Sequence, residues 1–266
     1  MKTINEYLSL AEFEAVIFEN QKIEISDAVL RRVKRSFNFL NEFSRNKVIY
    51  GVNTGFGPMA QYRIKDEDRL QLQYNLIRSH SSGTGKPIEP QAVKAAILAR
   101  LNTLSLGYSG VHPSLIHLMK ELINRDITPL IFEHGGVGAS GDLAPLAHLS
   151  LPLLGAGEVH FEGRKVAASE ILQKFDWQPI VLQSKEGLAL LNGTQFMSAY
   201  GAHVLIKACK FSWLADLIGT ISLEGFDGRK EPFNELIHFI RPHKGQIVTA
   251  NRILEFLDGS EIIAQK

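Results

Sequence analysis

The sequence predicts a mainly α fold with a few small β elements. Apolar residues recur at helical spacing over most of the chain, whereas strand-like runs are few and short. At 266 residues the chain is long enough to bury a substantial core, as one large domain or as a domain with the beginning of another.

Several segments have the helical period. The first extends from Val29 to Phe43, with Ser26 or Asp27 placed to cap its first turn. Pro113, directly after His112, suits the first turn of another helix, where a backbone amide needs no partner. The remaining segments with this period are 70–77, 93–106, 115–123 and 194–221.

The strand signals are weaker. Val48-Ile49-Tyr50 precedes a glycine-rich loop, and Val159-His160-Phe161 turns at Glu162-Gly163 towards Lys165-Val166. We therefore expect only small sheets.

The segment from Thr194 to Thr220 is longer than an ordinary globular helix and is apolar around much of its surface. Such a helix is usually buried in a bundle or between subunits, so we expect the chain to form oligomers. Residues 261–266 form no obvious closing element, and we expect a truncated chain.

The composition argues against several classes of function. Lys and Arg number 29 and Asp and Glu 28, so no excess of positive charge favours a nucleic acid or an anionic membrane as partner. No apolar run approaches the roughly 20 residues of a membrane span, and no signal-peptide pattern begins the chain. The single cysteine, Cys209, is expected to pack as a small hydrophobe in a cytoplasmic protein.

The most unusual segment is the glycine-rich run 135–146, which places Ala139-Ser140-Gly141 before a predicted helix. Taken alone, it would be a flexible connection in which Ser140 or Asp142 caps that helix. It lacks the Gly-Lys-Ser or Gly-Lys-Thr ending of a phosphate-binding loop and the Gly-x-Ser-x-Gly spacing of a nucleophile elbow.

The tripeptide Ala139-Ser140-Gly141 resembles the one that cyclises in the histidine and phenylalanine ammonia-lyase family. There the glycine amide nitrogen attacks the alanine carbonyl, and loss of water at that carbon and from the serine leaves 4-methylidene-imidazol-5-one (MIO). Gly141 lets the backbone bend back, Ser140 supplies the leaving hydroxyl and Ala139 adds little bulk. The resemblance implies MIO as the electrophile, with neither a metal nor pyridoxal phosphate. His112, His134 and His148 also lack the close helical pairing of zinc ligands.

Three further segments match the family in its order along the chain. The first is the run from Tyr50 to Gly57, in which the resemblance makes Tyr50 part of the removal of the substrate's β-proton and Gly57 a supporting position. This role requires surroundings that favour the phenolate, because an ordinary phenol is protonated at neutral pH. Outside the family, Tyr50 would be a packing residue with its hydroxyl satisfied locally.

His80 ends the second segment, 72–80. The resemblance places it against the ring of the substrate, because histidine occurs there in enzymes that act on histidine or tyrosine. A ring nitrogen can exchange hydrogen bonds with imidazole or phenol. The alternative to this binding role is a structural one, in which a cationic His80 side chain is favoured at the carboxyl end of its helix.

The third matching segment, 185–195, contains Asn192 and Gln195. Asn192 matches the family asparagine that contacts the prosthetic ring and the substrate, and its alternative is a turn residue paired with Gly193. Gln195, three positions after Asn192, makes this segment resemble the histidine lyases, and the resemblance assigns Gln195 to substrate binding. Asp142 either orients the precursor during cyclisation or caps the helix that follows it.

Together these matches imply the helical-bundle lyase fold of the fumarase/aspartase-like type. The expected division is an MIO-bearing domain over 1–190 and the beginning of a central long-helix bundle over 191–266. The implied protein is a cytoplasmic homotetramer that converts L-histidine to urocanate and ammonia. Conversion of L-tyrosine to p-coumarate, or the reaction of a related aminomutase, stays open. A catalytically inactive helical assembly fragment is the alternative from a different class.

Overall fold

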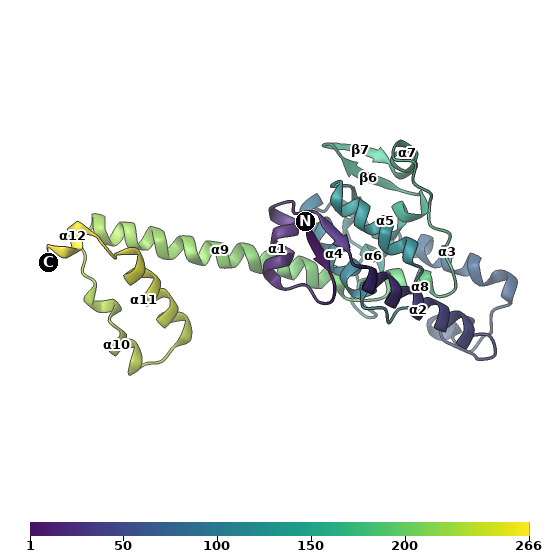
Figure 1. The fold of residues 1–266 in the computed structure, drawn as a ribbon, viewed down its shortest axis with the longest axis horizontal. Coiled ribbons are helices and arrows are strands. Elements are labelled where there is room, and N and C mark those ends of the chain that lie inside the picture. The colour runs from purple at the N-terminus through teal and green to yellow at the C-terminus, as the bar shows by residue number, and fades with distance from the viewer. Residues whose placement is uncertain (266) are drawn as a thin grey trace. The chain divides into compact units, whose positions relative to one another are not determined.

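The computed structural model describes residues 1–265, and the chain forms two compact units, Met1–His203 and Val204–Lys266. The predicted mainly α fold with small β elements is confirmed (Figure 1). The predicted division of the chain after residue 190 stays a prediction.

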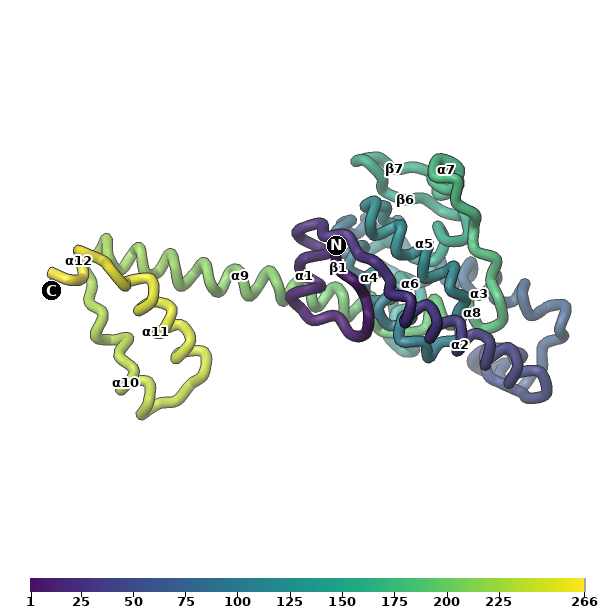
Figure 2. Tube along the Cα trace, in the orientation of Figure 1, coloured from purple at the N-terminus to yellow at the C-terminus, as the bar shows by residue number. Residues whose placement is uncertain are grey.

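Helices dominate the first unit. In chain order they are α1 (Leu10–Phe18), α2 (Asp27–Phe43), α3 (Arg69–His80), α4 (Pro90–Ser105), α5 (Pro113–Asn124), α6 (Leu143–Ser150), α7 (Ala168–Lys174) and α8 (Glu186–Leu191). Short 3-10 turns are η1 (Gly57–Met59), η2 (Asp66–Asp68) and η3 (Leu151–Leu154). Helix α4 contacts α1, α2 and α5, while α3, α6 and α8 pack on one another. Figure 2 traces this path from the purple N-terminus, with α4 and α6 in the middle of the unit.

The helix signals in the sequence correspond to observed helices and caps. The Ser26 side chain accepts a hydrogen bond from the Val29 amide at 3.4 Å, which caps α2. Pro113 occupies the first turn of α5, as predicted, and the Nδ1 atom of His112 accepts from the Ser114 amide. The predicted helices over 29–43, 70–77, 93–106 and 115–123 are confirmed.

The strands form three small sheets among the described residues. Strand β1 (Lys2–Ile4) pairs in parallel with β2 (Ile23–Ile25), and β3 (Thr84–Pro87) pairs antiparallel with β5 (Phe132–His134). The third sheet has the order β4 (Thr128–Pro129), β6 (Glu158–Phe161), β7 (Arg164–Ala167). The predicted β6–β7 hairpin is confirmed, and its two turn residues, Glu162 and Gly163, have φ of 50° and 74°, as a two-residue hairpin turn requires.

The predicted strand Val48-Ile49-Tyr50 is wrong, because Val48 and Ile49 have no regular structure and Tyr50 begins a turn. Its polar backbone is satisfied locally by the buried side chain of Asn53. That side chain accepts from the Ile49 amide at 2.7 Å and donates to the Lys47 carbonyl at 2.6 Å. With these groups already bonded, no neighbouring strand is needed.

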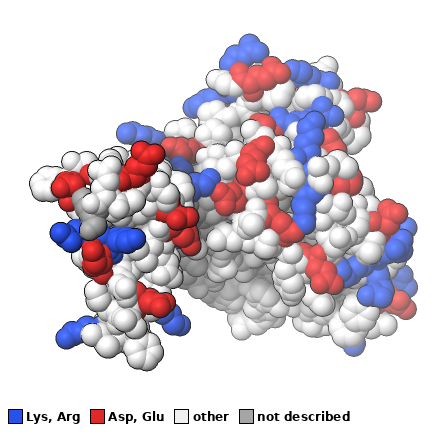
Figure 3. Space-filling model, turned by 60° about the vertical axis from the view of Figure 1, so that its left-hand side comes forward, with Lys and Arg blue, Asp and Glu red and all other residues white. Residues whose placement is uncertain are grey.

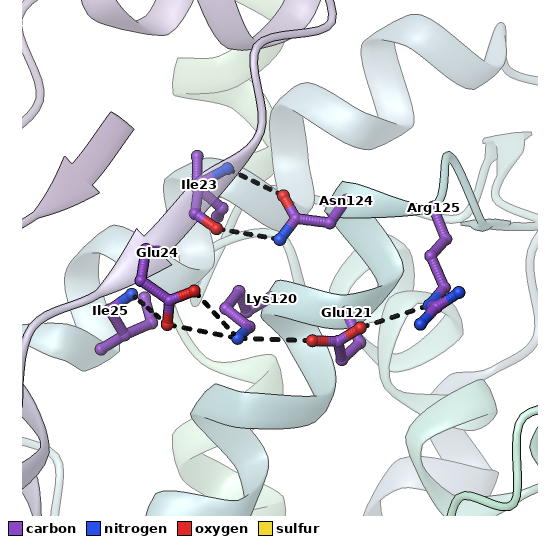
Figure 4. Close-up of polar contacts among 7 residues, drawn as sticks. All are labelled: Ile23, Glu24, Ile25, Lys120, Glu121, Asn124 and Arg125. Carbon is purple, nitrogen blue, oxygen red and sulfur yellow. Dashed lines mark hydrogen bonds and ion pairs between the residues drawn. The ribbon is translucent and has the colours of Figure 1, made fainter. Parts of the chain in front are cut away.

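Side chains of α5 attach β2 to the helices (Figure 4). Asn124 accepts from the Ile23 amide and donates to the Ile23 carbonyl, both at 2.8 Å, as a neighbouring strand would. Lys120 lies between Glu24 and Glu121, at 3.3 Å from each. The N-terminal strand pair is thereby fixed to the core that carries the site described below.

Helix α9 (Gln195–Gly225) confirms the predicted long helix; it begins in the first unit and continues into the second. The second unit also contains η4 (Glu231–Phe233), α10 (Glu235–Phe239), α11 (Lys244–Phe256) and α12 (Glu261–Ala264). Its small core consists of Ile253, Leu257 and Ile263, with Leu223 and Phe233 against them. The expected packing of Cys209 is wrong: this residue of α9 is exposed.

The surface charges are mixed. On the face shown in Figure 3, lysine and arginine side chains are interspersed with aspartate and glutamate side chains, in keeping with the formal net charge of +1. Within residues 1–265, none of the helices combines the length and the apolarity that crossing a bilayer requires.

Candidate active site

The glycine-rich loop and the end of α3 enclose a cavity of about 300 Å³. His80, in the last turn of α3, lines this cavity together with all three residues of the tripeptide 139–141. Leu143 and Ala144, at the start of α6, line it as well. Two segments that the sequence separates by almost sixty positions therefore line the same cavity.

Gly141 has a backbone that only glycine adopts readily, with φ of +93°. A Cβ atom added there would collide with the carbonyl oxygen of Gly193. Ser140, by contrast, is exposed. The tripeptide thus has a glycine packed closely against a second backbone segment and an exposed serine.

Asp142 joins this loop to the beginning of α9. Its amide donates to the Gly193 carbonyl at 2.7 Å, and its Oδ2 atom accepts from the Met197 amide at 2.8 Å. It holds the N-cap position of α6 but makes no side-chain cap bond to that helix. Its carboxylate therefore satisfies an otherwise unpaired amide in the first turn of α9.

His80 is held in one orientation by its own helix. Its Nδ1 atom lies 2.8 Å from the Leu76 carbonyl oxygen and 3.1 Å from the Ser79 hydroxyl. A carbonyl oxygen only accepts, so Nδ1 carries the proton in that contact. In the neutral ring, Nε2 is then an acceptor, suited to an N–H or O–H group of a ligand.

His148 supports the turn that follows His80. Its Nε2 atom accepts from the Gly83 amide at 2.9 Å, and its ring packs edge-on against Phe132 at 5.2 Å. Burial lowers the pKa of His148, which favours the neutral ring that this hydrogen bond requires.

Tyr50 is not among the residues that line this cavity. Its hydroxyl accepts from the Gly57 amide at 3.2 Å, and its ring packs edge-on against Phe56 at 6.0 Å. The side chain is half exposed, and Tyr50 does not line the cavity that contains His80. The structure brings Tyr50 and Gly57 together and leaves both outside that cavity.

Asn192 and Gln195 also lie outside the lining of this cavity. Asn192 ends α8 with an exposed side chain, and its carbonyl accepts from Arg100 at 3.1 Å. The Oε1 atom of Gln195 accepts from the other end of the same guanidinium. Both residues thus belong to the connection from α8 to α9, in which Gly193 contacts Gly141.

Arg100, on α4, was not singled out by the sequence. It is only 3% exposed, and burial lowers its pKa to about 10. The available signal was the position of Arg100, one of two cations in the apolar run 93–106, because a charge within such a run is buried at a cost that hydrogen bonds must offset.

Glu186 is a second buried charge that the sequence did not single out. Its two carboxylate oxygens accept from the amides of His112 and Gln183, each at 2.6 Å. Burial raises its pKa, while these two amides oppose that shift. It joins the start of α8 to the start of α5, which makes it a structural residue.

The helical fold thus places Ala139-Ser140-Gly141, before the start of α6, and His80, at the end of α3, around one cavity. A family described as aromatic amino acid lyase matches residues 8–266, and the chain belongs to that family.

The chain is similar to histidine ammonia-lyases of two bacteria. The chain is 43% identical over 257 residues to a histidine ammonia-lyase of Streptococcus pyogenes serotype M18, covering 96% of this chain and 50% of that protein. It is 43% identical over 256 residues to a histidine ammonia-lyase of Streptococcus sanguinis, with the same shares. The chain therefore spans half the length of these relatives.

Solved structures of two enzymes also match nearly all of this chain with about half of their own length. A tyrosine aminomutase from Streptomyces globisporus is 34% identical with a TM-score of 0.92, and the match covers 98% of this chain and 50% of that one. A histidine ammonia-lyase from Trypanosoma cruzi is 35% identical with a TM-score of 0.86, over 95% of this chain and 50% of that one.

Proposed function

We propose that the protein is an ammonia-lyase that converts L-histidine to urocanate and ammonia. The family match and the 43% identity to histidine ammonia-lyases support this proposal. The single observation that carries it is the cavity shared by His80 and the tripeptide 139–141.

The residues present fit an MIO group made from Ala139-Ser140-Gly141. Gly141 has a positive φ and no space for a side chain, and Asp142 is held at its amide and at its carboxylate. This arrangement restrains the backbone at the nitrogen that must approach the Ala139 carbonyl. MIO supplies an electron-poor alkene, which acts as an electron sink.

His80 is proposed to select the substrate. With its Nδ1 proton directed at the Leu76 carbonyl, Nε2 accepts a hydrogen bond from the imidazole N–H of histidine. A tyrosine hydroxyl can donate to the same atom, and the similarity to a tyrosine aminomutase favours that second candidate. An aminomutase would return the ammonia to the β-carbon.

Tyr50 is proposed as the base that removes the β-proton, and Asn192 as a contact to the prosthetic ring and substrate. Since Tyr50 does not line the His80 cavity of its own chain, we place it in the site of a neighbouring copy within a homotetramer. The exposed apolar residues of α9 support such assembly. We place this enzyme in the cytoplasm, and its partner is a small aromatic amino acid.

Intact-mass measurement tests the proposal first. We expect a mass lower by two water molecules, mapped to residues 139–141, and no such deficit in the variant Ser140→Ala. An unmodified mass in the parent chain would instead support the inactive assembly fragment.

Absorbance assays with full-length assemblies then test the substrate. We expect urocanate from histidine and little p-coumarate from tyrosine. Equal rates with both amino acids would overturn the choice of histidine, and a β-amino acid product would identify an aminomutase.

A further inference from the structure

Arg100 is a buried cation without a carboxylate partner. Among residues 1–265, no aspartate or glutamate lies within ion-pair distance of its guanidinium. All its hydrogen bonds go instead to neutral oxygens, namely the carbonyls of Ala189 and Asn192 and the side chain of Gln195. Burying a charge costs desolvation free energy, which these hydrogen bonds must offset.

These acceptors lie in one short segment, 189–195, which contains the end of α8, the connecting turn and the first residue of α9. The planar fork of an arginine can bond several oxygens in fixed directions, which a lysine cannot do. The turn also has no space for a side chain at Gly193, where a Cβ atom would collide with Arg100 and Gln195. Arg100 therefore fixes the position of the Gly193 backbone.

Gly193 in turn contacts the tripeptide. Its carbonyl accepts from the Asp142 amide at 2.7 Å, and the same carbonyl occupies the space where a Gly141 side chain would stand. A continuous set of contacts thus leads from the Arg100 guanidinium through Gly193 to the backbone of Gly141.

We propose that Arg100 is a positioning residue for cyclisation of Ala139-Ser140-Gly141; this inference rests on the proposed function. By fixing Gly193, it holds the Gly141 nitrogen near the Ala139 carbonyl carbon. The bond between these atoms forms as the Gly141 amide proton moves to the carbonyl oxygen.

The remaining atoms leave as two water molecules. The new hydroxyl departs with the Ser140 amide proton, and the Ser140 hydroxyl departs with the proton on the Ser140 α-carbon. No oxidant is needed. Arg100 makes no contact with the reacting atoms and acts only through the turn.

The test is the rate at which newly synthesised full-length protein loses water, followed by intact mass. In Arg100→Met we expect cyclisation about tenfold slower or more, corresponding to about 1.4 kcal/mol of lost positioning. Arg100→Lys restores the charge but not the fork, so its rate should lie between those of Arg100→Met and the parent.

Lys94→Met is the matched control, because Lys94 is also buried on α4 but pairs with Asp126. It should cyclise at the parental rate even though it loses stability. Circular dichroism and Tm identify any variant that fails to fold. If Arg100→Met is unfolded, Gln195→Leu, which removes one acceptor, takes its place and should slow cyclisation.

Three outcomes overturn the inference. They are parental rates in folded Arg100→Met or Gln195→Leu, equal slowing in Lys94→Met, and a parent chain that never loses water. The last outcome also removes the proposed function, whereas the first two leave it intact.

Discussion

At the scale of the residue, the site depends on close contact between two backbone segments. Gly141 and Gly193 meet without side chains, and Asp142 bonds to the same carbonyl. The tripeptide itself could be identified from the sequence, because its residue types match the chemistry. Its contact with Gly193 could not, since that contact is created by tertiary folding over about fifty positions.

Replacing Gly141 by alanine should abolish cyclisation. The added Cβ would collide with the Gly193 carbonyl, and the φ of +93° is strained for any other residue. Intact mass should show no loss of water. Gly136→Ala is the control in the same loop, because its nearest neighbours lie at 3.7 Å or more, and it should cyclise normally.

Replacing His80 by phenylalanine should weaken histidine turnover without affecting the tripeptide. The ring acceptor is lost, and we expect kcat/KM for histidine to fall about tenfold, the effect of one hydrogen bond of about 1.4 kcal/mol. Intact mass should still show the two-water deficit. An unchanged kcat/KM would show that His80 does not contribute to substrate binding.

At the scale of the element, the periodic helices and the β6–β7 hairpin followed from local sequence, because spacing and turn residues specify them. Local sequence failed at 48–50, where the side chain of Asn53 replaced a partner strand. Local sequence also gave no indication of the contacts of Arg100, because the carbonyls that accept from its guanidinium, those of Ala189 and Asn192, lie about ninety positions further along the chain.

The attachment of α6 to the turn after α3 should depend on pH. The pKa of folded His148 lies below its ordinary value of 6.5, so in mildly acidic solution the unfolded chain binds the proton more readily than the folded chain. The free energy of unfolding is therefore highest above pH 6.5 and falls as the pH drops from there towards the folded pKa. Urea titrations from pH 7.5 to about 5 should show this loss.

His148→Gln is the control for that titration. Glutamine can accept from the Gly83 amide but does not titrate in this range. Its free energy of unfolding should therefore fall less than that of the parent chain between pH 7 and 5. Parallel pH profiles would assign the effect to other groups.

At the scale of the whole molecule, the chain leaves much apolar surface uncovered along α9. Exposed large residues on this helix include Met197, Tyr200, Leu205, Phe211 and Ile218. The sequence predicted a long helix that needs neighbours, and the structure confirms the helix. That a second copy of the chain covers this surface stays a prediction.

A charge on that surface should weaken self-association. Phe211→Lys replaces a residue that is 68% exposed in the single chain, and burying such a side chain contributes about 1.5–3 kcal/mol. Sedimentation velocity over a range of concentrations should show smaller species than the parent chain forms. Ser169→Lys adds the same charge on exposed α7 and should leave association unchanged.

The bond between Asp142 and the first turn of α9 has a consequence for the order of events during synthesis. While a nascent chain is still emerging from the ribosome, Ala139-Ser140-Gly141 becomes available before Gly193 and Met197 have been made. The tripeptide then lacks the backbone that would confine it and remains an ordinary loop. On the proposed route, cyclisation therefore follows the synthesis and packing of this later segment. A mass lower by two water molecules then also shows that the segment with Gly193 and Met197 has packed against the loop.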